Sequence, residues 1–386
     1  MEFFKTISLN IFCFFLLMVI LKRIYNRKGQ ILVQNKLFLA LVLSNMTMLV
    51  LDSLGWAFEG GQHLFLNTFF NSLLFALMPI PLTTWILYSN FQIFHDKARI
   101  KKVFYPLCIL IIINAVISFS SPWTGWFFHV DANNIYHRGP YFLYHTSLAY
   151  ALLFYSFLII HFNQPLIEKR YFYSLLYFFL PQIICSTLQI VFYGLALHWV
   201  GMTFSVLIIY INIQDVAMKM DYLTGVYNRR QLDDYLRDNI INNPRAKTFA
   251  AIMIDLDEFK SINDSYGHSV GDEALQSAVV ILQDSIQSED IIVRYGGDEF
   301  LVLLDQDNLS DLEATVARIE KGMEQFNSSS NCAYKLSFSM GYALFNPHSD
   351  MTPAEFLKYI DALLYKNKNE KAIAVANPHS VIAAQG

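Results

Sequence analysis

The stretch IIVRYGGDEFLVLL, residues 291–304, decides how the second half of this chain folds. It contains two apolar runs, at 291–295 and 300–304, with Gly296-Gly297-Asp298-Glu299 between them. Paired glycines between two apolar runs are typical of a β-hairpin turn. We therefore predict two strands joined by a tight hairpin, with Asp298 and Glu299 on its exposed tip.

The sequence on either side of this hairpin alternates between strand-like and helix-like patterns. A continuous apolar run at 249–254 predicts a buried strand that ends in Asp255-Leu256-Asp257. Further elements are expected as helices at 231–241, 270–287, 312–326 and 353–368 and as a strand at 334–344. Strands joined by crossover helices, together with one hairpin, predict an α/β sheet covered by helices.

Carboxylates follow two of the predicted strands. Asp255 and Asp257 end the first strand, while Asp298 and Glu299 lie in the hairpin turn. Hard oxygen ligands of this kind suit Mg²⁺, which retains water and bridges phosphates. Glycines before the acids let a phosphate or a nucleoside approach the backbone closely, and paired divalent ions are a general solution for nucleotidyl transfer. Each pattern taken alone also fits acids that merely decorate turns.

Taken together, five ordered segments resemble the GGDEF family of diguanylate cyclases. These segments are Asp221-Tyr-Leu-Thr-Gly-Val-Tyr-Asn-Arg-Arg230, Asp255-Leu-Asp-Glu-Phe-Lys-Ser-Ile-Asn-Asp264, Gly267-His268, Gly271-Asp272 and Arg294-Tyr-Gly-Gly-Asp-Glu-Phe300. The resemblance covers residues 221–371 and implies a fold like the palm of nucleotidyl cyclases and polymerases. It also implies the condensation of two GTP into cyclic di-GMP and two pyrophosphates. Because each domain would carry one GTP, the resemblance implies a homodimer.

The resemblance assigns roles to individual residues. Asp255, Asp298 and the backbone carbonyl of Leu256 would hold Mg²⁺ or Mn²⁺, and Asp298 or Glu299 would help activate the ribose 3′-hydroxyl. Polar groups on the guanine edge would discriminate against adenine, and lysines would neutralise phosphate charge. The residues implied for substrate binding are Phe259, Lys260, Asn263, Asp272, Gly296, Gly297 and Lys368. Of these, Asn263 and Asp272 would hydrogen-bond to the guanine edge. Lys260 and Lys368 would neutralise the charge of the phosphates.

The sequence departs from the family in two places. An Arg-x-x-Asp product-inhibition site often precedes the signature, but here Gln287 takes the place of Arg, with Asp290 retained. Without a guanidinium to grip the product through two hydrogen bonds, feedback inhibition at this site is doubtful. Near the C-terminus, Lys371-Ala372 replaces a Gly-Arg pair. Because a point charge does not match a planar fork, we expect a lower affinity for GTP.

The first 213 residues have a different character. Over the whole chain 54% of residues are hydrophobic and 16% charged, compared with about 25% charged in ordinary globular proteins. Most of the apolar excess precedes residue 214, and about 20 apolar helical residues cross a bilayer. The predicted spans are 7–21, 37–58, 64–89, 103–120, 141–162, 171–192 and 197–216. We therefore expect an all-α transmembrane helical bundle at 1–213, a helical linker at 214–220, an α/β catalytic domain at 221–375 and a flexible tail at 376–386.

Lys and Arg residues collect in alternate connections of the predicted bundle, at 22–36, 97–102 and 169–170. By the positive-inside rule these connections are cytoplasmic. Seven spans then place the N-terminus outside and the catalytic domain in the cytoplasm, which holds GTP. The resemblance adds the bacterial cytoplasmic (inner) membrane. The net charge of −4 and the lack of a basic stripe in the second half argue against nucleic-acid binding.

The outer half of the bundle offers two places for a sensor ligand, whose identity the sequence does not give. The connection at 121–140 contains Trp123, Trp126, Phe127, Phe128, His129 and His137. These rings line a ligand mouth or form an interfacial aromatic belt, and the belt is the favoured interpretation. Asp52 lies in an apolar run, where an ionisable group indicates function by default. Its place near the outer end of the helix also fits a side chain wetted by water.

Three functions compete for this chain. The favoured one is a membrane-bound diguanylate cyclase gated by a signal that the transmembrane region senses. An alternative is a catalytically silent nucleotide-binding module that relays signals by contact, although Asp255, Asp298 and Glu299 are all retained. A transporter with a regulatory tail is a third, but the sequence shows no obvious repeat or central charged pathway.

Overall fold

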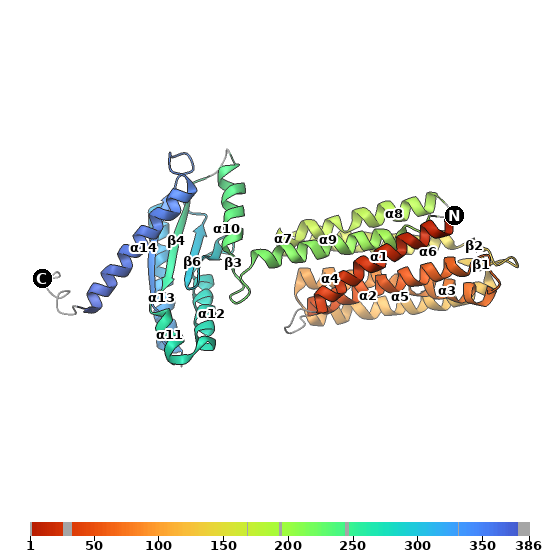
Figure 1. The fold of residues 1–386 in the computed structure, drawn as a ribbon, viewed down its shortest axis with the longest axis horizontal. Helices are drawn as coiled ribbons and strands as arrows, with labels where there is room; N and C mark the ends of the chain where they lie inside the picture. Colours follow the sequence, from red (N-terminus) through yellow and green to blue (C-terminus); the bar gives the residue numbers. More distant parts are fainter. Residues whose placement is uncertain are drawn as a thin grey trace. The chain divides into compact units, whose positions relative to one another are not determined.

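The protein was analysed as a computed structural model that describes residues 2–25, 33–167, 169–192, 195–243, 247–330 and 332–376. The predicted basic residues Arg27 and Lys28, and the tail at 377–386, lie outside this description. The chain divides into two compact units, Met1–Gln214 and Asp215–Gly386. Figure 1 shows the elements of both, and each unit is treated by itself below.

The first unit is a bundle of apolar helices. Seven stretches in the described residues are long and apolar enough to cross a membrane, which confirms the seven predicted spans. The helices are α1 (Glu2–Tyr25), α2 (Val33–Phe58), α3 (Leu64–Leu77), α4 (Pro79–Phe94), α5 (Lys97–Thr124), α6 (Phe142–Phe162), α7 (Lys169–Tyr177), α8 (Phe179–Val191) and α9 (His198–Lys219). Helix α9 runs through the predicted linker almost to its end.

The third predicted span is interrupted at Met78, where α3 ends and α4 begins. The cause is Pro79, whose missing N–H leaves the carbonyl of Phe75 without its usual helical donor. Asn114 of α5 fills that role, because its Nδ2 donates to Phe75 O at 2.8 Å. A neighbouring helix therefore satisfies the freed backbone group, as a membrane interior requires.

The sixth predicted span is interrupted in a similar way, between α7 and α8 at Phe178. Here Ser205 of α9 donates its hydroxyl to Phe178 O at 2.5 Å. Close packing of α8 on α9 depends on Gly201, since a Cβ there would lie only 2.6 Å from Cys185 Cβ. These interruptions separate helices that hydropathy alone treats as single spans.

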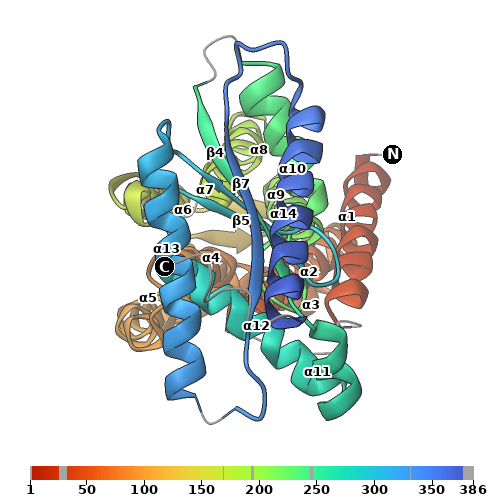
Figure 2. The ribbon, with the colours of Figure 1, turned by 90° about the vertical axis from the view of Figure 1, so that its left-hand side faces the viewer.

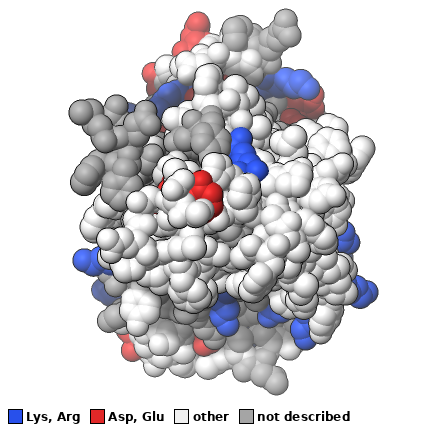
Figure 3. All heavy atoms as spheres, turned by 90° about the vertical axis from the view of Figure 1, so that its right-hand side faces the viewer, with Lys and Arg blue, Asp and Glu red and all other residues white. Residues whose placement is uncertain are grey.

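A short hairpin that the sequence did not predict covers one end of the bundle. Strands β1 (Phe128–Val130) and β2 (Tyr136–Arg138) pair antiparallel. Phe128 is fully buried and its ring stacks on Phe75, so the favoured aromatic belt is wrong for this residue. Trp123 and Trp126 are exposed, as a belt requires. Figure 3 looks onto this end, where charged side chains are few apart from one small acidic and one small basic group near the centre.

The second unit is built on a mixed five-stranded sheet with the strand order β3-β5-β6-β4-β7. Its strands are β3 (Tyr227–Asn228), β4 (Phe249–Leu256), β5 (Ile291–Arg294), β6 (Glu299–Leu304) and β7 (Phe338–Phe345). Strands β5 and β6 pair antiparallel, which confirms the predicted hairpin. β4 lies between β6 and β7 and is buried along its whole length, as its continuous apolar run predicts.

Helices cover both faces of this sheet. They are α10 (Arg229–Leu236), α11 (Phe259–Tyr266), α12 (His268–Ser285), α13 (Leu309–Ser329) and α14 (Pro353–Ala376). Alternate residues of β4 enter different cores: Ile252 and Ile254 pack with α12 and α13, whereas Ala251 and Met253 pack with α10 and α14. Figure 2 shows α13 and α14 on either side of β7. This alternation decides which helix each residue at the end of β4 meets.

One predicted strand boundary was wrong, and one helix was missed. The strand predicted at 334–344 begins only at Phe338, because Tyr334 and Leu336 are buried in the loop before it. Helix α11 was not predicted, since it has only eight residues, most of them polar. It follows β4 through Glu258, whose φ of 56° lies in the left-handed region.

The close packing of α14 on the sheet generates a stability prediction. A Cβ on Gly341 of β7 would collide with the backbone of Ile360 and Leu364 in α14. We expect Gly341→Ala to destabilise the second unit by about 1–3 kcal/mol, because a backbone cannot yield as a side chain does. Pulse proteolysis of the detergent-solubilised chain in urea measures this. Gly297→Ala is the control, since nothing lies within 4 Å of its Cβ, and an equal loss in both variants would contradict the prediction.

Candidate active site

Asp255 occupies the end of the most buried strand in the second unit. By the alternation of β4 it lies on the α14 face of the sheet, and Lys368 of α14 meets it with Nζ 2.8 Å from Oδ1. The residue is only 8% exposed. In the antiparallel register with β6, Asp255 stands opposite Glu299. The structure thus brings together two acids that are 44 positions apart in the sequence.

The hairpin turn holds its acids closer to the sheet than the sequence predicted. Asp298 and Glu299 are half-buried, so the predicted exposed tip is wrong. Glu299 already belongs to β6, and Asp298 accepts a hydrogen bond from Leu256 N through its backbone oxygen, at 3.2 Å. A Cβ on Gly296 would lie 2.6 Å from Glu299 Oε2. The absence of a side chain at Gly296 therefore leaves the space that the Glu299 carboxylate occupies.

Negative charge at this end of the sheet exceeds what the nearby side chains neutralise. Burial raises the pKa of Asp255, and the Asp298 and Asp257 carboxylates add to this against the opposing effect of Lys368. The pKa of Glu299 is raised by burial and then by Asp255 and Asp298. The pKa of Lys368 is raised chiefly by its hydrogen bond to Asp255. Each shift indicates a place where additional positive charge is favourable.

This donor set fits a divalent cation that is shared with a phosphate. Among the residues that the structure describes, no three His, Cys, Asp or Glu side chains lie close enough to hold a metal by themselves. An oxygen-rich site with fewer protein ligands is typical of Mg²⁺, which takes its remaining ligands from water and phosphates. The Lys368 ammonium beside Asp255 shows that a cation is accommodated there.

The segment after β4 provides polar groups on the opposite side of the sheet. Helix α11 begins at Phe259 and has no side-chain cap on its first N–H groups, which makes its start suitable for an anion. Phe259 is half-buried and packs against the core, while Lys260 is exposed. Asn263 lies over the first turn of α12, because a Cβ on Gly271 would collide with its amide. Asp272 follows Gly271 and is exposed.

The residues that depart from the family pattern make contacts of their own. Lys371 lies 3.6 Å from Asp257 and donates to the carbonyl of Phe338. Asp257 also accepts hydrogen bonds from the hydroxyls of Ser337 and Ser339. Lys371 is therefore engaged with Asp257 and with the first residue of β7.

The predicted inhibitory pair forms a local turn. Asp290 accepts hydrogen bonds from Gln287 N at 2.8 Å and from Asp305 N at 3.1 Å. The side chain of Gln287 is exposed. Asp290 thus stabilises the entry to β5 through backbone contacts.

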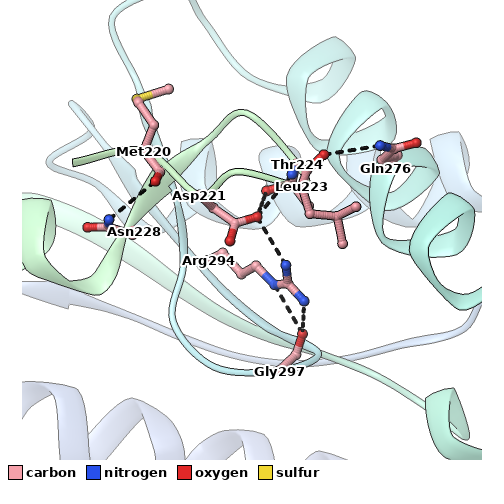
Figure 4. A network of polar contacts seen from close by, with 8 residues as sticks. All are labelled: Met220, Asp221, Leu223, Thr224, Asn228, Gln276, Arg294 and Gly297. Carbon is pink, nitrogen blue, oxygen red and sulfur yellow. Dashed lines mark hydrogen bonds and ion pairs between the residues drawn. The ribbon is translucent and has the colours of Figure 1, made fainter. Parts of the chain in front are cut away.

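A polar network that sequence reasoning missed connects the end of α9 to the hairpin turn (Figure 4). Asp221 accepts hydrogen bonds from Thr224 N, from Thr224 Oγ1 and from Arg294 Nη1, the last at 3.0 Å. Arg294 also donates from Nε and Nη2 to Gly297 O, at 3.1 and 2.7 Å. Although burial opposes it, the combined effect of Thr224 and Arg294 lowers the pKa of Asp221.

The same connection is anchored on both sides of Asp221. Asn228 Nδ2 donates to the carbonyl of Met218. Figure 4 shows its second bond, to the carbonyl of Met220, and the bond from Gln276 Nε2 to Leu223 O. Residues 221–230 and 294–300 were recognised as separate segments, but their spacing in the sequence gives no sign that they touch. Within the second unit, the network joins the segment that follows α9 to the turn that carries Asp298.

Comparison with known proteins agrees with this geometry. Residues 218–373 match the family described as "Diguanylate cyclase, GGDEF domain". These residues form a GGDEF domain. Within it, the sheet, its helices and the acids at the ends of β4 and β6 are the elements described above.

The GGDEF domain has relatives in several bacteria. The chain is 36% identical over 181 residues to the probable diguanylate cyclase DgcC of Escherichia coli K12, which covers 46% of this chain and 48% of DgcC. This chain thus spans about half the length of DgcC. The GGDEF domain of TpbB (YfiN) from Pseudomonas aeruginosa is 31% identical and covers 39% of this chain and 89% of its own, with a TM-score of 0.36.

A third relative extends into the first unit. It is an uncharacterized membrane protein of Staphylococcus saprophyticus, 27% identical over 308 residues, which are 78% of this chain and 84% of the relative. Together with the seven apolar helices, this similarity makes the chain a multi-pass membrane protein with a GGDEF domain.

The Asp221–Arg294 network generates a prediction about local dynamics. We expect Arg294→Lys to loosen the Asp221 turn and the hairpin turn together, because one ammonium cannot replace three N–H donors in a fixed fork. Hydrogen–deuterium exchange should become faster in residues 221–226 and 295–299 alike. Arg318→Lys is the matched control, since Arg318 bonds to Ser285 and Thr315 instead. Faster exchange in only one of the two segments would show that they are independent.

Proposed function

We propose that this chain is a diguanylate cyclase of the bacterial cytoplasmic membrane, which condenses two GTP into cyclic di-GMP and two pyrophosphates. One observation supports the activity above all others. Asp255 and Glu299 stand opposite each other at the ends of β4 and β6, beside Asp298, with more negative charge than the protein neutralises. A degenerate, silent module has no need to retain such a costly arrangement.

The acids at the sheet end would hold Mg²⁺ or Mn²⁺ through Asp255, Asp298 and the carbonyl of Leu256. When bound, the ion supplies Lewis-acid stabilisation of the charge on the triphosphate. Lys368 already places an ammonium beside Asp255 and adds positive charge at the same point. The uncapped start of α11, at Phe259 and Lys260, receives phosphate oxygens.

The guanine edge would be read by Asn263, whose amide Gly271 allows to lie over the first turn of α12, and by Asp272, which follows Gly271. An amide and a carboxylate match the donors and acceptors of guanine, and a base with the opposite pattern would leave them unpaired. Gly296 and Gly297 give the nucleotide access to the hairpin backbone. Asp298 or Glu299 orients the ribose 3′-hydroxyl and accepts its proton.

The reaction itself requires two GGDEF domains. The 3′-oxygen of one GTP attacks the α-phosphorus of the other. The bond between that phosphorus and the oxygen that bridges it to the β-phosphate breaks, and pyrophosphate leaves. The 3′-oxygen of the second nucleotide then attacks the α-phosphorus of the first in the same way. A second pyrophosphate leaves and the ring closes. Because each domain holds one nucleotide, we infer that the chain acts as a homodimer.

The domain organisation follows from the same reasoning. We propose a sensor at 1–213, a helical linker at 214–220, the catalytic domain at 221–375 and a tail from 376. Basic residues cluster at the start of α5, in Lys97, Arg99, Lys101 and Lys102, whereas its other end leads to the β1–β2 hairpin. This asymmetry supports a cytoplasmic catalytic domain and an outer β1–β2 hairpin.

The activity is tested by cyclic di-GMP production from GTP and Mg²⁺ with the detergent-solubilised chain. We expect Asp298→Ala to lower the rate at least about 100-fold, since charge stabilisation at the phosphates is worth several kcal/mol. Asp307→Ala, an exposed acid after β6, should leave the rate unchanged. A folded chain that binds GTP without forming product would instead be a silent nucleotide-binding module.

Guanine recognition generates a further prediction. Gly271→Ala should displace the Asn263 amide and raise KM for GTP about three- to tenfold, the equivalent of one lost hydrogen bond, with a smaller effect on kcat. Steady-state kinetics measures both constants. Val280→Ala, an exposed position on the same helix, is the control. An unchanged KM for GTP in Gly271→Ala would show that Asn263 does not contribute to substrate binding.

A further inference from the structure

The first unit contains a partly open cavity of about 350 Å³ near the β1–β2 end of the bundle. A volume of this size suits a small organic molecule. Helices α2, α3, α6, α8 and α9 contribute to its wall, and Ile135, Tyr136 and Arg138 close it from the hairpin side. Asn134 fixes the hairpin there, because its Nδ2 donates to Phe58 O at 2.6 Å and to Gly61 O at 3.0 Å.

A buried carboxylate lines this cavity. Asp52 is 7% exposed, so the idea of a side chain wetted at the helix end is wrong. Within the described part of the chain its one hydrogen-bond donor is Asn10, at 2.7 Å, and no described cation pairs with it. A carboxylate inside an apolar bundle normally has a positive partner or a function. Among the described residues none pairs a cation with Asp52, which leaves its carboxylate available to a cationic ligand.

Two other polar side chains of the wall, Asn71 and Arg138, are already committed as donors. Asn71 Nδ2 donates to the backbone and side-chain oxygens of Asn67. Arg138 donates to the carbonyls of Gln189 and Ile190, and its guanidinium stacks on Phe142. At Asp52 the wall thus offers carboxylate oxygens to an occupant, and a group that complements this point is a hydrogen-bond donor.

The charge and the aromatic content of the wall also favour a cationic occupant. Its ionisable acids are Asp52 and Glu59, set against the single guanidinium of Arg138. The aromatic side chains of the wall are Trp56, Phe75, Tyr136, Phe142, Tyr150 and Trp199. Aromatic faces attract cations and also pack against apolar groups. We propose that this cavity binds a small organic amine in its cationic form, with the ammonium on Asp52 and the apolar part among these rings.

The proposal rests on the proposed function only for its effect on output, because binding is measured without GTP. Isothermal titration of the detergent-solubilised full chain compares phenethylamine with phenethyl alcohol, and tryptamine with tryptophol. Each pair differs in the ammonium alone. We expect both amines to bind at least about tenfold more tightly than their alcohols. Equal affinity within both pairs would overturn the proposal.

Substitutions locate the site. Asp52→Asn should remove the preference for amines and leave the alcohols unaffected, and Asp52→Glu should retain the preference. Asn45→Ala is the matched control, since Asn45 is buried on the same helix but bonds to Thr203, outside the cavity wall. Amine binding that survives Asp52→Asn with its preference intact would overturn the assignment.

A second variant decides the matter if Asp52→Asn does not give a monodisperse protein. Ala149→Phe fills the cavity from α6 while Asp52 remains. We expect it to abolish binding of amines and alcohols alike, and unchanged amine binding would place the site elsewhere. Cyclic di-GMP production with and without amine is measured separately. A chain that binds amine but makes no product would contradict the cyclase and leave this proposal standing.

Discussion

The register between β4 and β6 is the constraint on which the GGDEF domain depends. It places Asp255 opposite Glu299, and in this register both apolar faces of β4 are buried. Since side chains alternate along a strand, a slip of one residue would turn the acids to the opposite face, away from Lys368. The favourable free energy of burying the cores on both sides of β4 thus offsets the unfavourable crowding of negative charge at its end.

The same principle operates in the bundle, where the constraint is hydrogen bonding. Prolines interrupt two of the spans, and each interruption frees backbone carbonyls in a region without water. Asn114 satisfies the Phe75 carbonyl that Pro79 frees, and Ser205 donates to the Phe178 carbonyl at the second interruption. Polar residues that hydropathy treats as exceptions in apolar segments are therefore part of how these helices hold together. Asp52 differs from them, because its partner Asn10 leaves its charge uncompensated.

The Asp221–Arg294 network joins two segments of the second unit that are far apart in the sequence. Residue 221 follows α9 almost directly, and Arg294 relays its position to the carbonyl of Gly297 in the hairpin turn. A shift of Asp221, which follows the end of α9, would therefore act through Arg294 on the turn that carries Asp298. This contact needs no large movement, since one guanidinium bonds to both segments.

The sequence by itself determined the seven apolar spans, the α/β sheet with its hairpin, and the residues that resemble a GGDEF signature, because each rests on local periodicity or on a contiguous motif. It did not determine the eight-residue α11, the two interrupted spans or the β1–β2 hairpin. Only the tertiary structure decided that Asp298 and Glu299 are half-buried, that Lys371 engages Asp257, that Arg294 joins two distant motifs and that Asp52 lines a cavity. These contacts join residues far apart in the chain, and their formation depends on packing that no local pattern encodes.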